Sequence, residues 1–147
     1  MRIPHDGLVA VADGGKMLFF RNQGDAFRPR LTLVHGEEAI NPPARDQVSD
    51  APGRAFSSVG PGRSAYERAD PHQIEEERFA AETAALLRQR ALAGDYDALI
   101  VVAPPRTLGE LRRHYHKEVT SRLLAEVPKN LTGHPVEEIE RLLTAAD

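Results

Sequence analysis

The chain contains no cysteine among its 147 residues. This absence excludes disulfide bonds, zinc sites built from thiolates, and cysteine nucleophiles, and it suits a reducing compartment. A metal site in this protein would have to use histidine and carboxylate side chains.

Long apolar runs and a strong net charge are also missing. No stretch is long enough to cross a membrane, and the short apolar run near the amino terminus is interrupted by Asp13, which does not fit a secretory signal. A formal net charge of −3 argues against nucleic-acid binding through overall charge, but it is compatible with a local basic face. Length and a hydrophobic fraction of 41% predict a single domain over residues 1–147. Because no secretory signal or membrane span is visible, we expect it to be cytoplasmic.

Residues 96–116 predict the centre of the fold. The unbroken apolar run from Leu99 to Val102 is typical of a strand buried on both faces. After two prolines, Thr107 and Glu110 have capping-box spacing, which predicts a helix beginning near Leu108. The turn between such a strand and helix is a common ligand-binding position, yet this one has no glycine-rich phosphate loop, nucleophile elbow or metal-ligand spacing.

The amino-terminal part predicts three antiparallel strands. Residues 7–13 and 16–21 are apolar-rich and are separated by Asp13-Gly14-Gly15, which predicts a hairpin turn with positive φ. Residues 30–35 alternate polar and apolar side chains, so we expect a third strand with one exposed face.

Helices and strands alternate in the second half. Asp70 and Pro71 begin an amphipathic pattern that predicts a long helix, which Gly94 ends. The residues Leu123–Val127 fit either the end of a helix or a last strand, and we favour the strand. Pro135 opens a terminal helix. The order β-β-β-α-β-α-β-α predicts an α/β, ribonuclease H-like fold, in which a mixed five-stranded sheet carries helices on both faces.

Residues 36–69 predict a long loop, because they are rich in proline, glycine and serine and show no sustained periodicity. Loops of this length are usually functional or disordered. Arg54 and Arg63 are candidate contacts to phosphate or carboxylate, and Gly60 and Gly62 would let a ligand approach the backbone. Alternatively, the arginines tie an ordered surface loop to the domain.

Catalytic and metal-binding patterns are weak. A ribonuclease H-like nuclease needs several carboxylates at strand ends to hold two metal ions, but the central strand ends without one. Asp13 and Glu75–Glu77 are the nearest candidates, and Asp13 is better explained as a turn residue. His114 and His116 would point to different sides of a helix, and His134 fits a cap before the terminal helix. We therefore predict no catalytic residue, metal or cofactor.

A local basic face is predicted between residues 104 and 124. Its cations exceed its two acids, Glu110 and Glu118, by three. This face either contacts RNA phosphates or is a solvated helix face whose cations pair with acidic neighbours. The cations are Arg106, Arg112, Arg113, Lys117 and Arg122, of which the first four are the candidate RNA contacts.

Three blocks of sequence resemble the bacterial host-attachment protein family: VSDAPGRAFSSVGPGRSAYERADPHQIEEERFA, YDALIVVAPPRTLGELRRHYH and KNLTGHPVEEIERLL. The opening LVAVADGGKMLFFRN also agrees, and APPRTLGELR is the most specific part. Members of this family resemble the middle domain of archaeal and eukaryotic peptide-chain release factors and of Pelota. The resemblance implies a ribonuclease H-like fold.

The resemblance also bears on function. In release factors, a Gly-Gly-Gln loop before the long helix promotes peptidyl-tRNA hydrolysis. Residues 60–64, which look equivalent, have glycines but no glutamine, so this activity is not carried over. We therefore expect a non-catalytic cytoplasmic protein that contacts the ribosome or structured RNA. The alternatives are a metal-dependent hydrolase of RNA or a phosphoester that uses Asp13 and the loop, and an attachment-related interaction protein.

Overall fold

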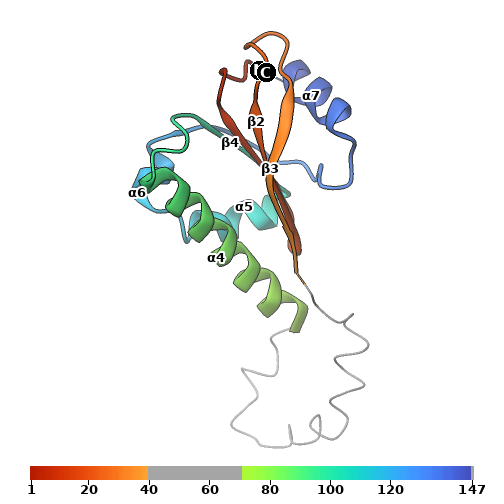
Figure 1. Ribbon diagram of the computed structural model, residues 1–147. Coiled ribbons are helices and arrows are strands. Elements are labelled where there is room, and N and C mark those ends of the chain that lie inside the picture. The colour runs from red at the N-terminus through yellow and green to blue at the C-terminus, as the bar shows by residue number, and fades with distance from the viewer. Residues whose placement is uncertain (40–70, 147) are drawn as a thin grey trace, which may run out of the picture.

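A computed structural model describes residues 1–39 and 71–146 of the chain (Figure 1). The predicted order of strands and helices is confirmed in these ranges, with one short helix in addition, α6. None of the helices described there is long and apolar enough to span a membrane. The elements are β1 (Leu8–Ala12), β2 (Lys16–Asn22), β3 (Leu31–Glu38), α4 (Pro71–Leu92), β4 (Leu99–Val102), α5 (Pro105–Arg112), α6 (Lys117–Thr120), β5 (Leu123–Val127) and α7 (Val136–Ala145).

The five strands form one mixed sheet in the order β3-β2-β1-β4-β5. The pairs β1–β2 and β2–β3 are antiparallel, whereas β1–β4 and β4–β5 are parallel. Helices α4, α5 and α6 lie on one side of the sheet and α7 lies on the other (Figure 1). The predicted mixed sheet with helices on both faces, arranged as in ribonuclease H-like folds, is therefore confirmed.

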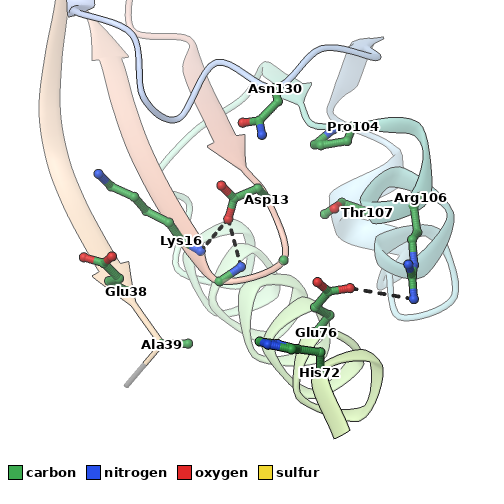
Figure 2. A pocket seen from close by; sticks show the side chains of 12 residues that line it. Asp13, Lys16, Glu38, Ala39, His72, Glu76, Pro104, Arg106, Thr107 and Asn130 are labelled. Carbon is green, nitrogen blue, oxygen red and sulfur yellow. Dashed lines mark hydrogen bonds and ion pairs between the residues drawn. The ribbon is translucent and has the colours of Figure 1, made fainter. Parts of the chain in front are cut away.

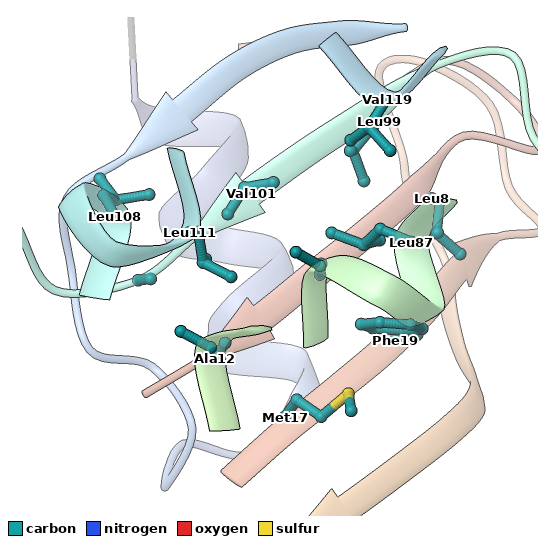
Figure 3. Packing of buried hydrophobic residues seen from close by; sticks show 14 of the residues in the cluster. Leu8, Ala12, Met17, Phe19, Leu87, Leu99, Val101, Leu108, Leu111 and Val119 are labelled. Atoms are coloured by element: carbon teal, nitrogen blue, oxygen red, sulfur yellow. The ribbon is translucent and has the colours of Figure 1, made fainter. Parts of the chain in front are cut away.

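The two central parallel strands are buried along their whole length, because helices cover both of their faces. Leu8 and Ala10 of β1 point to the face covered by α4, α5 and α6, whereas Val9 and Val11 point to α7. Figure 3 shows the first of these clusters, in which Leu87 of α4 packs over the sheet. A continuous apolar run is what this two-sided burial requires.

Helix α4 has the one-sided apolar stripe that the sequence predicts, and it ends where predicted. Gly94 has a φ of +72°, a conformation that strains other residues, and the Asp95 amide donates to the Arg90 carbonyl at 2.9 Å. Beyond this turn, the Tyr96 hydroxyl donates to the Leu87 carbonyl at 2.9 Å. This hydrogen bond holds the segment before β4 against α4.

Two predicted helix starts are wrong. Helix α5 begins at Pro105, so the capping box does not form; Thr107 and Glu110 lie inside the helix and are buried. The fixed φ and missing amide of proline suit a first helical position, which explains the earlier start. In α7 the N-cap is Pro135 itself, so His134 is not the cap.

The hairpin between β1 and β2 is confirmed, but its turn does not use positive φ at either glycine. Strand β3 continues to Glu38, three residues beyond its predicted end, so the part of the predicted loop before residue 39 is strand. The rest of that loop, and the predicted cap Asp70, lie outside the described residues.

Candidate functional site

A cavity of about 590 Å³ opens where β1 and β4 end, at the edge of the sheet shown in Figure 2. Because these two strands are parallel neighbours, their carboxyl ends meet at one edge. The β1–β2 turn, the end of β3 and the first turns of α4 and α5 supply most of the lining. This is the position at which open α/β sheets usually bind ligands.

Asp13, at the end of β1, uses both carboxylate oxygens inside the protein. Its Oδ1 accepts hydrogen bonds from the backbone amides of Gly15 and Lys16, both at 2.8 Å (Figure 2). Its Oδ2 accepts a hydrogen bond from the Thr132 hydroxyl at 2.7 Å. The same hydroxyl lies 2.9 Å from Oδ1 of Asn130. Asp13 is thus a turn residue, as the sequence predicts, that also ties the hairpin to the segment after β5.

The charges around the cavity are mixed. Lys16 and Arg106 bring positive charge, whereas Glu38 and Glu76 bring negative charge. Arg106 and Glu76 approach to 3.8 Å across the gap between α5 and α4 (Figure 2). A Cβ at Gly14 would lie only 2.6 Å from the Cγ of Glu76, so this glycine lets α4 approach the turn. The arrangement suits polar contacts to a ligand better than capture of a polyanion by charge alone.

Glu110 of α5 is a buried carboxyl group, with an exposed fraction of 8%. Burial raises the pKa of Glu110, and the nearby carboxylate of Glu76 raises it further. Among the described residues, no three histidine, aspartate or glutamate side chains are arranged to hold a metal ion.

Three cations of the predicted basic face are engaged by carboxylates. Arg112 donates to Oε1 of Glu126 from Nε at 2.9 Å and from Nη2 at 2.6 Å, and this contact raises the pKa of Arg112. Arg122 donates to Glu118 at 2.8 Å, which lowers the pKa of Glu118. The third is Arg106, described above. The face is therefore partly the paired helix surface that was the alternative interpretation.

Arg113 and Lys117 remain as exposed cations that form no ion pair within the described parts of the chain. They lie on either side of the short connection between α5 and α6. His116 in this connection has a local role, because its Nδ1 accepts a hydrogen bond from the Glu118 amide at 3.0 Å and caps α6.

Four predicted contacts, Arg54, Gly60, Gly62 and Arg63, lie outside the described residues. Ala39, directly before the segment of residues 40–70, and His72, two residues after it, both line the cavity. The sequence analysis missed Asn130 and Thr132. Neither has a local signal, because Thr132 meets Asp13 from 119 positions away in the chain.

Comparison with known proteins gives one family. The family model for bacterial archaeo-eukaryotic release factor family 12 matches residues 6–143. No curated protein shows significant similarity to the chain.

Solved structures show weaker similarity. The crystal structure of the archaeal translation termination factor aRF1 has a TM-score of 0.45 and 15% identity, and the match covers 95% of this chain and 35% of that one. A structure described as an archaeal protein has a TM-score of 0.44 and 15% identity, covering 95% of this chain and 36% of that chain. The chain therefore spans little more than a third of the length of either.

Proposed function

Because the chain belongs to bacterial archaeo-eukaryotic release factor family 12, we propose that it is a cytoplasmic, non-catalytic protein that binds the ribosome through structured RNA. The observation that carries this proposal is the family match over residues 6–143, nearly the whole chain. The sequence resemblance to host-attachment proteins concerns the same blocks, and the attachment role itself stays a prediction.

The described surface supports contact with phosphates at one place. Arg113 and Lys117 are exposed and form no ion pair with a carboxylate in the described ranges. Phosphate contacts of this kind supply most of the affinity of nucleic-acid binding that does not depend on sequence. Arg112 is a weaker candidate, because Glu126 already occupies its guanidinium group.

Arg54 and Arg63 remain part of the proposal on sequence grounds. They belong to the segment that joins two cavity-lining residues, Ala39 and His72. Guanidinium groups are fork-shaped donors that suit phosphate oxygens. The part of the binding side that the described residues form is the surface at the connection between α5 and α6, where Arg113 and Lys117 lie.

A non-catalytic role agrees with the engagement of Asp13. Both oxygens of Asp13 accept hydrogen bonds from the protein, two at Oδ1 and one at Oδ2, so this carboxylate has a structural role in the turn. This structural role supports the non-catalytic proposal over the competing hydrolase hypothesis.

Co-sedimentation with purified ribosomes tests the proposal. The protein should pellet with ribosomes and return to the supernatant after nuclease treatment. The double variant Arg113→Ala/Lys117→Ala should weaken binding about tenfold or more, because it removes two phosphate contacts. The matched control is Arg28→Ala/Arg88→Ala, which removes two exposed cations from the β2–β3 turn and from α4.

Two results would refute the proposal. One is wild-type protein that stays in the supernatant at every ribosome concentration. The other is equal weakening by both double variants, which would mean that binding depends on total charge and not on this side of the protein. Arg54→Ala/Arg63→Ala measures the contribution of the segment between Ala39 and His72 separately.

A further inference from the structure

Strand β3 forms one end of the sheet, and no strand within the described residues pairs with its outer edge. The middle of this edge is apolar: Leu33 is 53% exposed and Val34 is 37% exposed. An unpaired strand edge presents backbone amides and carbonyls that can pair with another strand. Two large apolar side chains in its centre add a surface that gains from burial.

Of the devices that usually protect such an edge, β3 has a bulge and charged residues at its end, but others are missing. Proteins commonly place lysine or proline on an edge strand, and β3 contains neither. Helix α7 protects only the amino-terminal end, where Oε2 of Glu140 accepts a hydrogen bond from the Leu31 amide at 2.7 Å. A bulge leaves Val34 without a partner on β2, since Phe20 pairs with Leu33 and Phe19 with His35. The bulge bends the strand but introduces no charge at its centre.

Charge is distributed along β3 in a way that favours one partner. Exposed Arg28 and Arg30 precede the strand, and exposed Glu37 and Glu38 end it. An antiparallel copy of the same strand would place basic ends opposite acidic ends. With Val34 on the two-fold axis, Arg30 of each copy would face Glu38 of the other, because 30 and 38 are equally distant from 34.

We propose that β3 pairs antiparallel with β3 of a second copy of this chain, so that two five-stranded sheets join into one continuous sheet in a symmetric dimer. Opposite charges directly across an antiparallel pair stabilise it, and like charges destabilise it. A two-fold axis makes every such contact occur twice. The interface is therefore self-complementary in both hydrogen bonding and charge.

The other end of the sheet does not have this property. Strand β5 also has an unpaired outer edge within the described chain, and its Leu124 is 57% exposed. However, the charged residues at its two ends, Arg122 and Lys129, are both cations, and Arg122 is already engaged by Glu118, so an antiparallel copy would not place basic ends opposite acidic ends. Exposed apolar surface alone thus does not distinguish the two edges, whereas charge does.

Cysteine crosslinking tests the position of the axis, and the chain is suited to it because it has no native cysteine. Residues directly opposite each other in antiparallel strands have Cα atoms about 4.5 to 5.5 Å apart, within the range that a disulfide bond spans. The full-length variant Val34→Cys should therefore form a disulfide-linked dimer under mild oxidation. The matched control, Leu124→Cys on the β5 edge, should stay monomeric.

Charge reversal tests the pairing itself. Sedimentation equilibrium of the wild-type protein should show a dimer with twice the 16.2 kDa mass of one chain, in equilibrium with monomer. Arg30→Glu and Glu38→Arg should each raise the dissociation constant about tenfold, because each replaces two attractive pairs by two repulsive ones. The double variant Arg30→Glu/Glu38→Arg should restore wild-type affinity to within about threefold, since it recreates both pairs with reversed signs.

Monomeric wild-type protein at all concentrations up to its solubility limit would overturn the proposal. So would equal crosslinking of Val34→Cys and Leu124→Cys, or a double charge reversal that dimerises no better than the single variants. If another segment of the same chain covered the outer edge of β3, the wild-type protein would stay monomeric. The proposal does not depend on ribosome binding, and its failure would leave the proposed function unchanged.

Discussion

Asp13 allows a quantitative test of whether the carboxylate at the end of β1 stabilises the turn or performs chemistry. Asp13→Ala removes the acceptor for the Gly15 and Lys16 amides and for the Thr132 hydroxyl. Hydrogen bonds to charged groups contribute about 1.5 to 3 kcal/mol each, but water can replace part of this loss at a half-buried position. We expect Asp13→Ala to lower the free energy of unfolding by about 3 kcal/mol.

Asp13→Asn should cost much less, about 1 kcal/mol. The asparagine oxygen can still accept both backbone amides, and its amide group can donate to the Thr132 hydroxyl oxygen. That hydroxyl can then donate to Oδ1 of Asn130, which is 2.9 Å away. The hydrogen-bond network is therefore satisfied again, and only the charge is lost.

Urea denaturation of the two variants and the wild type measures these differences, provided that the m-value is unchanged. Thr132→Val, alone and combined with Asp13→Ala, completes a double-mutant cycle, in which we expect a coupling of about 1 to 2 kcal/mol. Equal destabilisation by Asp13→Ala and Asp13→Asn would refute the hydrogen-bond account. A phosphoester-hydrolysis activity that Asp13→Asn abolishes at unchanged stability would favour the hydrolase alternative.

Two further predictions concern stability. Asn22 is fully buried and bonds backbone groups of both the amino-terminal segment and the β2–β3 turn, so Asn22→Ala should cost about 3 kcal/mol in urea denaturation, against less than about 0.5 kcal/mol for the exposed Thr32→Ala. Burial raises the pKa of Tyr96 from 10.0 to about 12, so the unfolded chain loses this proton at lower pH than the folded protein. Protonated Tyr96 should contribute at most about 3 kcal/mol to the free energy of unfolding. This contribution should be fully present below pH 10 and should be lost as the pH rises to about 12. Denaturation at several pH values should show a shallower decline in Tyr96→Phe, and an equally steep decline in this variant would contradict the assignment.

The parts of the fold that sequence predicts best are those in which local pattern and burial agree. Strand β5 occupies Leu123–Val127, the range that the sequence favours. Helix α4 ends at Leu92, and Gly94 forms the turn that follows it because glycine adopts a positive φ without strain. The buried β4 appears as an unbroken apolar run because helices cover both faces. In each case the local sequence pattern is compatible with only one local structure.

Other sequence patterns are compatible with two local structures, and tertiary packing determines which of them forms. The spacing of Thr107 and Glu110 fits a capping box, but it equally fits two residues on the inner side of a helix that begins at Pro105. Strand β3 continues to Glu38 because pairing with β2 needs only backbone groups, so its polar end lacks the alternation that a sequence pattern detects. Neither the start of α5 nor the end of β3 can be predicted without knowing which elements pack or pair with these residues.

The number of cations in a segment does not predict how many are available to bind phosphates, because partners from other elements pair with some of them. This difference changes the expected salt dependence of ribosome binding. The segment from residue 104 to 124 has five cations, but Glu126 and Glu76, which pair with Arg112 and Arg106, belong to other elements. If all five cations contacted phosphates, the logarithm of the binding constant would fall with the logarithm of salt concentration with a slope of about −4. Two contacts, from Arg113 and Lys117, give a slope of about −2. The difference in slope between wild type and Arg113→Ala/Lys117→Ala should therefore be about 2. A change of about 1 in Arg112→Ala alone would mean that the Glu126 pair opens when the protein binds.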